Sequence, residues 1–596
     1  MLSKRTLIVV LAIWQYIYLI AQPDTLILGY GGYSGVSISA SSNVGPGSSE
    51  NTMNQDGFIP NENAASRFLS QATLGYDYSD IISVTEAGIE AWIENQLTIP
   101  RSFTLESKIR QYHKMVKDST NTPTAGAGNR LWDYAWWQYL MTSQDDLRQR
   151  VALALSEMLV ISENSAFNNN AYAMGVYYDK LLNHSFGNYR NLLRDVTYNP
   201  SMGIYLTYLN NPKANPALNQ YPDENYSREL MQLFTIGTVM LNNDGSIILD
   251  DNGLPVPSYD NEDIIELSKI FTGLTWADRT QWNRGALNDT SYIADMVMWN
   301  TWHEPGVKNL LNGFVVPNRN PVNGVADIND ALDNLFNHQN TPPFVCRFLI
   351  QRLVTSNPSP AFINRVANVF INNGQGVRGD LAAVVKAILL DPEAKSCESG
   401  ENVEFGMLRE PFIRYVQINK AFNASTLSGN YRNDMSYIYQ YTGQRPLTSP
   451  SVFNFFQQDY QPIGAVEEAG LVAPEFQITD AQTIAGFING LYRWVINGDI
   501  ADEYDLFSNE ADANYTDEIS VIDVSGETTY TDNDKLHILM DRLNLLLSQG
   551  RVSDTSLNTI INVLKEFPNT TVTEKQDRTK LAIYLLMTSP EYLINR

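Results

Sequence analysis

The stretch PDENYSRELMQLFTIG, from Pro222 to Gly237, predicts one helix with a defined beginning and end. The Asp223 carboxylate is suited to cap the free backbone amides of a first turn. Gly237 is suited to the left-handed conformation that often ends a helix. With roughly 100° between successive residues, the large apolar side chains share one wide arc. That arc consists of Tyr226, Leu230, Met231, Leu233 and Phe234.

The other side of this helix carries a concentrated polar stripe of Asn225, Arg228, Glu229 and Gln232. Glu224 and Arg228 are four positions apart, as are Asn225 and Glu229, so each pair is close enough to bond. One interpretation is a solvated face with ordinary charge pairs. The other is an enclosed, fully bonded network that either holds the architecture together or lines a pocket. The helix itself does not separate the two.

The remaining pattern predicts a mostly α-helical, multi-helix globular domain over residues 61–596. Strand signals are sparse, and only one small β-hairpin is expected, in Gly245–Tyr259, where Asp250–Gly253 holds turn residues. Helical spacing of apolar residues recurs over 64–72, 85–96, 131–141, 147–160, 192–197, 263–271, 326–336, 343–354, 361–371, 381–390, 410–422 and 479–495, and three helices follow Leu536.

Residues 1–21 have the features of a secretory signal peptide: Lys4 and Arg5, an apolar run from Leu7 to Ile20, and then Ala21. That run is too short for a comfortable transmembrane helix. Residues 22–60 are rich in Gly, Ser and Asn, which is typical of a flexible leader. We therefore expect an exported protein, periplasmic, surface-bound or extracellular, with no transmembrane segment once the signal is removed.

The composition is acidic, with a formal net charge of −25 over 596 residues. Such a chain is not suited to nucleic acid, because phosphate backbones require a basic surface. Residues 497–534 hold no Lys or Arg and predict an acidic loop or insertion, with a calcium site as the alternative although no EF-hand spacing is present. Export permits a disulfide between Cys346 and Cys397, but Cys346 fits a buried free thiol equally well.

Eight segments resemble, in order, the bacterial family catalogued as domain of unknown function 1800. They are Ala65–Gly75, Leu147–Val151, Glu224–Leu230, Phe271–Trp276, Trp302–Lys308, Leu408–Pro411, Ser449–Phe456 and Met587–Tyr592. Each is weak alone, and the ordered set is specific. The resemblance implies an exported, mostly helical protein with a possible sulfatase-like partner, because members are often encoded beside the exported family named domain of unknown function 1501. It implies no established activity, catalytic residues or cofactor.

One departure from that family excludes a metal site built on the family's histidines. Many members have a His-rich stretch after the Leu-Arg-x-Arg motif, whereas Ala152–Glu157 contains no histidine here. The five histidines of the chain form no cluster with zinc-ligand spacing, so no metal site is predicted. His303 is the most suggestive of them, in a turn beside Glu304 and near Lys308, where it could act as a general acid or base. The alternative is a histidine that caps a turn and packs on Trp302.

An enzyme hypothesis places a site between the 222–237 helix and the His303 turn. The predicted catalytic residues are Glu229, Arg228, His303 and Glu304, and the predicted binding residues are Glu224, Asn225, Arg150, Lys308 and Trp302. Arg150 is expected to pair with a carboxylate of the helix, with a structural role as the alternative. The nucleophile elbow of α/β-hydrolases, the P-loop and the dinucleotide fingerprint are all absent from the sequence.

Two functions follow as hypotheses. The first is a role in cell-surface or extracellular polymer metabolism alongside a sulfatase-like partner. The second is a non-enzymatic binding or scaffold protein whose recognition lies on aromatic loops, with polysaccharide as a candidate ligand. Tryptophans suit the faces of sugar rings, but Trp132, Trp136 and Trp137 share a helical stretch and fit core packing as well. Trp299 and Trp302 carry the same ambiguity.

Overall fold

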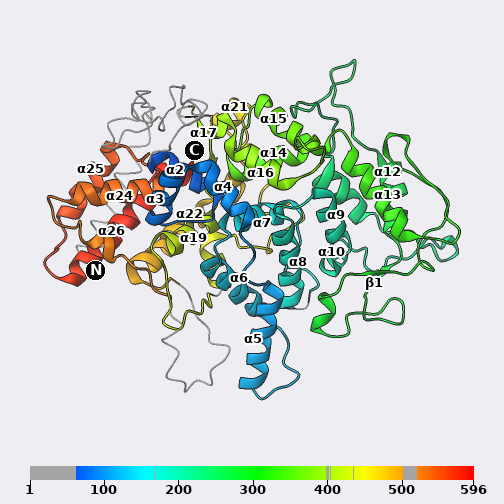
Figure 1. The fold of residues 1–596 in the computed structure, drawn as a ribbon, viewed down its shortest axis with the longest axis horizontal. Helices are drawn as coiled ribbons and strands as arrows, with labels where there is room; N and C mark the ends of the chain where they lie inside the picture. The colour runs from blue at the N-terminus through cyan, green and yellow to red at the C-terminus, as the bar shows by residue number, and fades with distance from the viewer. Residues whose placement is uncertain (1–61, 168, 397–401, 403, 434, 501–519) are drawn as a thin grey trace.

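The computed structural model describes residues 62–167, 169–396, 402, 404–433, 435–500 and 520–596, which form a mostly helical body with three small two-stranded sheets (Figure 1). The predicted fold class is therefore confirmed. The predicted signal peptide, the leader, Cys397 and the middle of the acidic segment lie outside these residues. Across the described ranges, no helix combines the length and apolarity needed to cross a membrane.

The helices before residue 206 pack around an aromatic core. Trp132 and Trp137 are completely buried, and Trp136 meets the ring of Trp137 edge-on at 5.5 Å. These three tryptophans thus serve core packing and are not available to a ligand. The helices are α2 (Glu62–Ala72), α3 (Tyr78–Ala87), α4 (Ile89–Thr98), α5 (Leu105–Ser119), α6 (Arg130–Thr142), α7 (Asp146–Met158), α8 (Ala171–His184), α9 (Tyr189–Thr197) and α10 (Pro200–Tyr205).

The 222–237 helix begins later than predicted and changes its winding. Its α-helical part, α11, runs from Asn225 to Glu229, and it continues as the π-helix η4 (Leu230–Thr235). Glu224 takes the N-cap position, and the Asp223 carboxylate accepts from the backbone of Asn225 at 2.9 Å. Because the wider π-turn breaks the 3.6-residue period, the polar stripe does not continue along one face. Gly237 has φ +68° and ends the segment as predicted.

Short β-ladders follow this helix. Isolated bridges pair Leu241 with Ile247 and Leu249 with Pro255. The second bridge encloses a turn at Asp250–Gly253, which lies where the hairpin was predicted. Two antiparallel sheets come after it, β1 with β2 and β3 with β4. The elements of this region are η3 (Pro216–Leu218), α12 (Asn261–Ser268), η5 (Lys269–Phe271), β1 (Leu274–Thr275), η6 (Asp289–Tyr292), β2 (Val297–Met298), β3 (Lys308–Asn309), η7 (Leu311–Gly313) and β4 (Val315–Val316).

The last third returns to helices and closes onto α2. Arg67 of α2 donates through Nε to the Arg596 carbonyl at 2.9 Å, and Figure 1 shows α2 beside α24. The elements are α13 (Gly324–Asn337), α14 (Thr341–Leu353), α15 (Pro360–Ile371), α16 (Leu381–Leu390), α17 (Pro392–Lys395), β5 (Met407–Leu408), α19 (Pro411–Ala421), α20 (Met435–Thr442), α21 (Ala465–Glu468), η8 (Pro474–Ile478), α22 (Ala481–Leu491), η9 (Tyr492–Asn497), α23 (Ser525–Thr528), α24 (Leu536–Ser548), α25 (Asp554–Lys565), α26 (Val572–Met587), α27 (Pro590–Leu593) and β6 (Ile594–Asn595).

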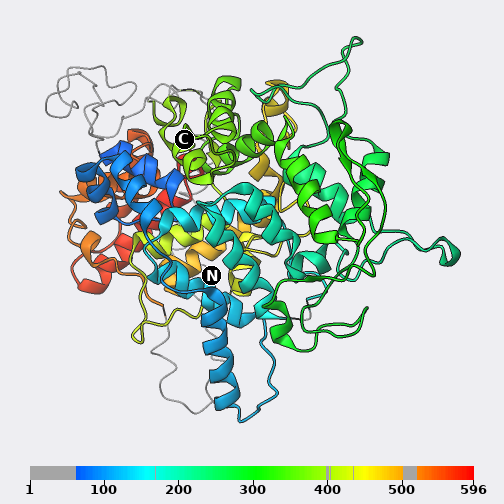
Figure 2. The same cartoon turned by 45° about the vertical axis from the view of Figure 1, so that its right-hand side comes forward.

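Two features of the shape matter for function. The helix α5 projects from the body, and the loops between α10 and α13 extend over the side opposite α24–α26 (Figures 1 and 2). Strands β5 and β6 pair inside the body, with Met407 opposite Asn595. This pairing brings the segment before α19 against the last residues of the chain.

Candidate functional site

The outer part of the 222–237 helix is solvated. Arg228 donates through Nη2 to Glu224 Oε2 at 3.1 Å, which is the predicted ion pair, and the two side chains are 40% and 38% exposed. The Asn225 side chain donates to Thr207 Oγ1 at 3.4 Å, and in the described chain no hydrogen bond joins it to Glu229. These three residues therefore match the surface interpretation, where an ion pair stabilises little.

Glu229 behaves differently. Only 6% of it is exposed, and its Oε2 has no hydrogen-bond partner among the described residues. Burial raises the pKa of Glu229, while the Arg228 charge lowers it less. Burial also raises the pKa of Tyr205 to about 12, and the Glu229 carboxylate adds to this rise. Glu229 is thus the one buried member of the stripe.

The His303 turn is a buried ionic cluster. Its Nδ1 lies 2.9 Å from the Thr272 carbonyl and donates to it, and its Nε2 lies 3.0 Å from Asp327 Oδ2. Lys308 donates to the Glu304 carbonyl at 2.7 Å and also binds Asp327. Burial raises the pKa of Asp327, but hydrogen bonds from His303 and Lys308 outweigh burial and hold that pKa below its usual value. The cluster has the chemistry of a fixed structural support.

Glu304 and Trp302 face away from this cluster. The Glu304 carboxylate accepts from the Ala214 backbone at 2.7 Å, so it anchors the preceding loop and does not serve His303. The Trp302 ring stacks on Trp282, with 4.9 Å between the centroids and 8° between the planes. Among the described residues, no hydrogen bond or ion pair links Arg228 or Glu229 to His303. The predicted site is therefore divided into two separately bonded groups.

Arg150 belongs to a third group in the centre of the molecule, which corrects the expected pairing with the 222–237 helix. It is 2% exposed and donates through Nη2 to the Arg352 carbonyl. Arg352 pairs through Nε with Glu157 Oε2 at 2.9 Å and lies 3.7 Å from Glu475 Oε1. The sequence expectation failed because the partners of Arg150 come from distant parts of the chain.

We call this group the central cluster: Arg150 and Glu157 of α7, Arg352 of α14, Glu410 before α19 and Glu475 of η8. Gln444 bonds both Glu157 Oε1, at 3.4 Å, and Glu410 Oε2. Burial and then the Glu410 charge raise the pKa of Glu157 well above its usual value. The neighbouring Glu410 carboxylate thus favours the protonated form of Glu157.

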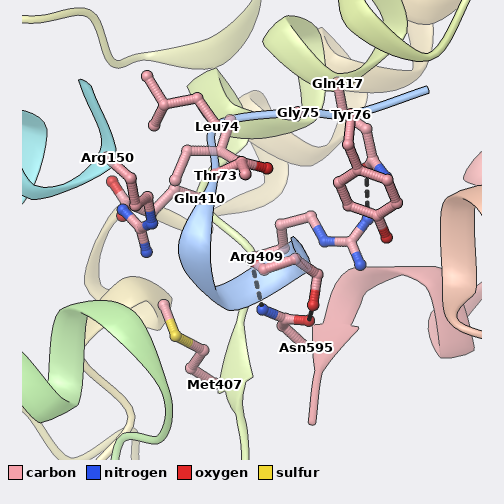
Figure 3. Close-up of a pocket in the computed structure, with 12 residues that line it drawn as sticks. Thr73, Leu74, Gly75, Tyr76, Arg150, Met407, Arg409, Glu410, Gln417 and Asn595 are labelled. Atoms are coloured by element: carbon pink, nitrogen blue, oxygen red, sulfur yellow. Dashed lines mark hydrogen bonds between the residues drawn. The ribbon is translucent and has the colours of Figure 1, made fainter. Parts of the chain in front are cut away.

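Arg150 and Glu410 both line a small cavity (Figure 3). Its volume of about 20 Å³ is enough for one water molecule and too small for a substrate. Arg150 Nε and Nη1 and Glu410 Oε1 have no hydrogen-bond partner within the described part of the chain. A water between them would satisfy these groups. The cavity also borders Thr73, Gly75, Arg409, Gln417 and Asn595.

Sequence reasoning missed Asp327, Glu157, Arg352 and Glu475. One signal was present, because Arg150 and Glu157 lie seven positions apart and share a face of α7. No local sequence pattern identifies Asp327, Arg352 or Glu475 as members of a site. No group of three or more His, Cys, Asp and Glu residues in the described ranges is arranged to hold a metal ion.

Both the fold and these sites define a large helical protein in which several charged side chains are buried and bonded to one another. A family model described as "Protein of unknown function (DUF1800)" matches residues 67–594. The chain therefore belongs to the DUF1800 family. Among curated proteins no match was found, and none among solved structures.

The family motifs separate into two groups in space. Ala65–Gly75 and Leu408–Pro411 contribute residues to the cavity of the central cluster, and Phe456 lies under the Arg352 guanidinium at 4.5 Å. In the other group, Tyr226 meets Phe271 edge-on at 4.8 Å, and Thr272 binds His303. The first group surrounds a buried centre, and the second supports the surface loops that carry Trp302.

Proposed function

We propose that this protein is exported and binds an extracellular polysaccharide through a tryptophan surface formed by Trp282, Trp299 and Trp302. The observation that carries the proposal is the stacking of Trp282 on Trp302, with Trp299 6.1 Å from Trp282. All three rings are partly exposed, in contrast to the buried tryptophans of the core. Partly exposed aromatic rings suit the apolar faces of sugars.

The backbone fixes this surface in place. Trp299 donates its backbone N–H to Gly273 at 2.7 Å, Trp302 donates to Trp299 at 2.8 Å, and the Trp302 carbonyl accepts from Lys213 at 2.8 Å. The next residue, His303, is held by Asp327. A binding surface that is ordered before the ligand arrives loses less conformational entropy on binding.

Polar groups border the rings. Gln281, Arg284, Asn300 and Thr301 are exposed beside the three tryptophans in sequence. Amide, guanidinium and hydroxyl groups can bond the hydroxyls of a sugar, while the rings contact its apolar face. We also propose a role in polymer metabolism alongside a sulfatase-like partner, on the ground of the family resemblance.

Affinity electrophoresis tests the proposal, with soluble β-glucan, xylan or mannan in the gel. We expect at least one of these neutral polymers to retard the mature protein. The double variant Trp282→Ala/Trp302→Ala should bind that polymer about tenfold or more weakly, equivalent to about 1.4 kcal/mol. The variant Tyr492→Ala is the matched control, because Tyr492 is an aromatic side chain 47% exposed on a different element. Equal retardation of the double variant and wild type would overturn the proposal, as would no retardation of folded wild type.

A further inference from the structure

The helix α5 carries the densest run of basic residues in an acidic chain. Between Lys108 and Lys117 the sequence has four Lys or Arg and no Asp or Glu, and no other window of ten residues holds four basic residues. The whole chain has a formal net charge of −25. A local concentration of positive charge on such a protein raises the local concentration of anions.

This run borders a groove between α5 and the loops that pack beside it. The groove has a volume of about 580 Å³, within the range of about 300–1,000 Å³ that small-molecule sites occupy. Figures 1 and 2 show α5 projecting from the body. The lining residues are Arg110, His113, Lys114, Lys117, Asp118, Asn121, Pro123, Tyr172 and Thr290.

The positive charges of the groove are available to a ligand. Arg110 pairs with Glu106 and Lys114 pairs with Asp118 at 2.5 Å, both as exposed pairs one turn apart. Pairs of this kind contribute little stability, so an incoming anion can compete for them. Lys117 forms no ion pair with any other described residue. Three cations and one carboxylate line the groove, which leaves it net positive.

The floor and wall of the groove are held in place by hydrogen bonds. His113 donates through Nε2 to the Ala125 carbonyl at 2.7 Å, and its Nδ1 accepts from the Tyr172 hydroxyl at 3.2 Å. Asp289 accepts from the Ala127 backbone at 2.8 Å, which fixes the turn that carries Thr290. The Asp289 carboxylate is thus bonded to the protein backbone.

We propose that this groove binds a polysaccharide segment that carries oxyanions, either carboxylates or sulfates. Arg110, Lys114 and Lys117 would contact the oxyanions, and the exposed ring of Pro123 would contact the sugar. The choice of a polysaccharide rests on the proposed function, whereas the charge of the ligand rests on the groove alone. The site differs from the tryptophan surface, so the two can be tested separately.

Binding to polygalacturonate, dextran sulfate and uncharged dextran tests this inference, by affinity electrophoresis of the full mature chain. We expect retardation by at least one charged polymer and none by dextran, and raising NaCl from about 50 to 300 mM should weaken that binding. Lys114→Ala/Lys117→Ala should weaken it about tenfold. The matched control is Lys535→Ala/Lys565→Ala, which removes two exposed lysines elsewhere and should bind as wild type does. Whichever charged polymer binds distinguishes carboxylate from sulfate recognition.

The two proposals fail in different ways. In one outcome, Trp282→Ala/Trp302→Ala loses binding to the neutral polymer, while wild type and Lys114→Ala/Lys117→Ala bind the charged polymer equally. That outcome overturns the proposal for the groove and leaves the proposal for the tryptophan surface standing. Titration of trigalacturonate by calorimetry gives a readout that needs no long polymer. Salt-sensitive binding of this trimer by wild type and not by the lysine variant supports the groove even if every neutral polymer fails. Equal binding by both proteins, or no binding of any charged probe, overturns it.

Discussion

Individual buried charges in this protein depend on their partners for their protonation state. Glu157 and Glu410 both bond to Gln444, and the pKa of Glu157 is raised by burial and by the Glu410 charge. Arg352 is the cation beside both Glu157 and Glu475. Substitutions of Glu157, whose protonated form is favoured, and of the charged Arg352 should therefore change the free energy of unfolding by very different amounts.

Glu157→Gln tests this difference. The amide resembles the protonated acid in shape and charge, so we expect the free energy of unfolding at pH 7 to change by less than about 1 kcal/mol. Arg352→Met keeps much of the volume but removes the buried cation beside Glu157 and Glu475, and should cost about 3–5 kcal/mol. Urea denaturation followed by circular dichroism measures both. Comparable losses in the two variants would show that Glu157 is ionised.

At the scale of elements, local signals predicted much of the helical structure. The residues that cap a helix and the apolar residues that define its buried face are close together in the sequence. Helices such as α13 and α16 could therefore be placed correctly from the sequence. The π-helical turn after Glu229 was missed, because packing rather than local pattern selects it. Polar contacts between elements were also missed. His303 and Asp327 lie 24 positions apart, and Arg150 and Arg352 lie 202 apart, and no pattern in one segment identifies the other.

Packing between elements also positions the basic groove. The helix α5 lies against α8 at Gly175, where an added Cβ would fall 2.2 Å from the Ile109 Cδ1 atom. Gly175→Ala should therefore destabilise the protein by about 1–3 kcal/mol through overpacking, although alanine is the better helix former. Thermal unfolding of the variant measures the loss.

The same contact provides a specific rescue. Ile109→Val removes the one methyl group that the new Cβ would meet, at a cost of about 0.5–1.5 kcal/mol when made alone. In the Gly175→Ala background it should instead raise the melting temperature. A double variant less stable than Gly175→Ala would mean that something other than this contact sets the distance between α5 and α8.

At the scale of the whole molecule, the central cluster connects segments that are far apart in sequence. It joins α7, α14, the start of α19 and η8, and the strand pair β5–β6 brings the last residues against the same region. Burial raises the pKa of Glu157 and of Glu475 in the folded state. The stability of the entire domain should then depend on pH through these groups.

Glu475 sets the sign of that dependence. Burial raises the pKa of Glu475 from 4.5 to about 7, with Arg352 opposing the rise. Between these values the folded state keeps a proton that the unfolded state releases, so its contribution is complete below pH 4.5 and is lost as pH rises through about 7. The shift corresponds to about 3 kcal/mol.

Urea denaturation of wild type and Glu475→Gln at several pH values between about 5 and 8 measures this contribution. The variant cannot titrate at this position, so it should gain stability relative to wild type as pH rises, by about 3 kcal/mol over the full range. Asp480→Asn is a matched control, because the exposed Asp480 carboxylate has a pKa lowered by a hydrogen bond from the Thr483 backbone and stays ionised throughout. Parallel curves for wild type and Glu475→Gln would show that Glu475 is already ionised in the folded protein, and that Arg352 compensates its burial completely.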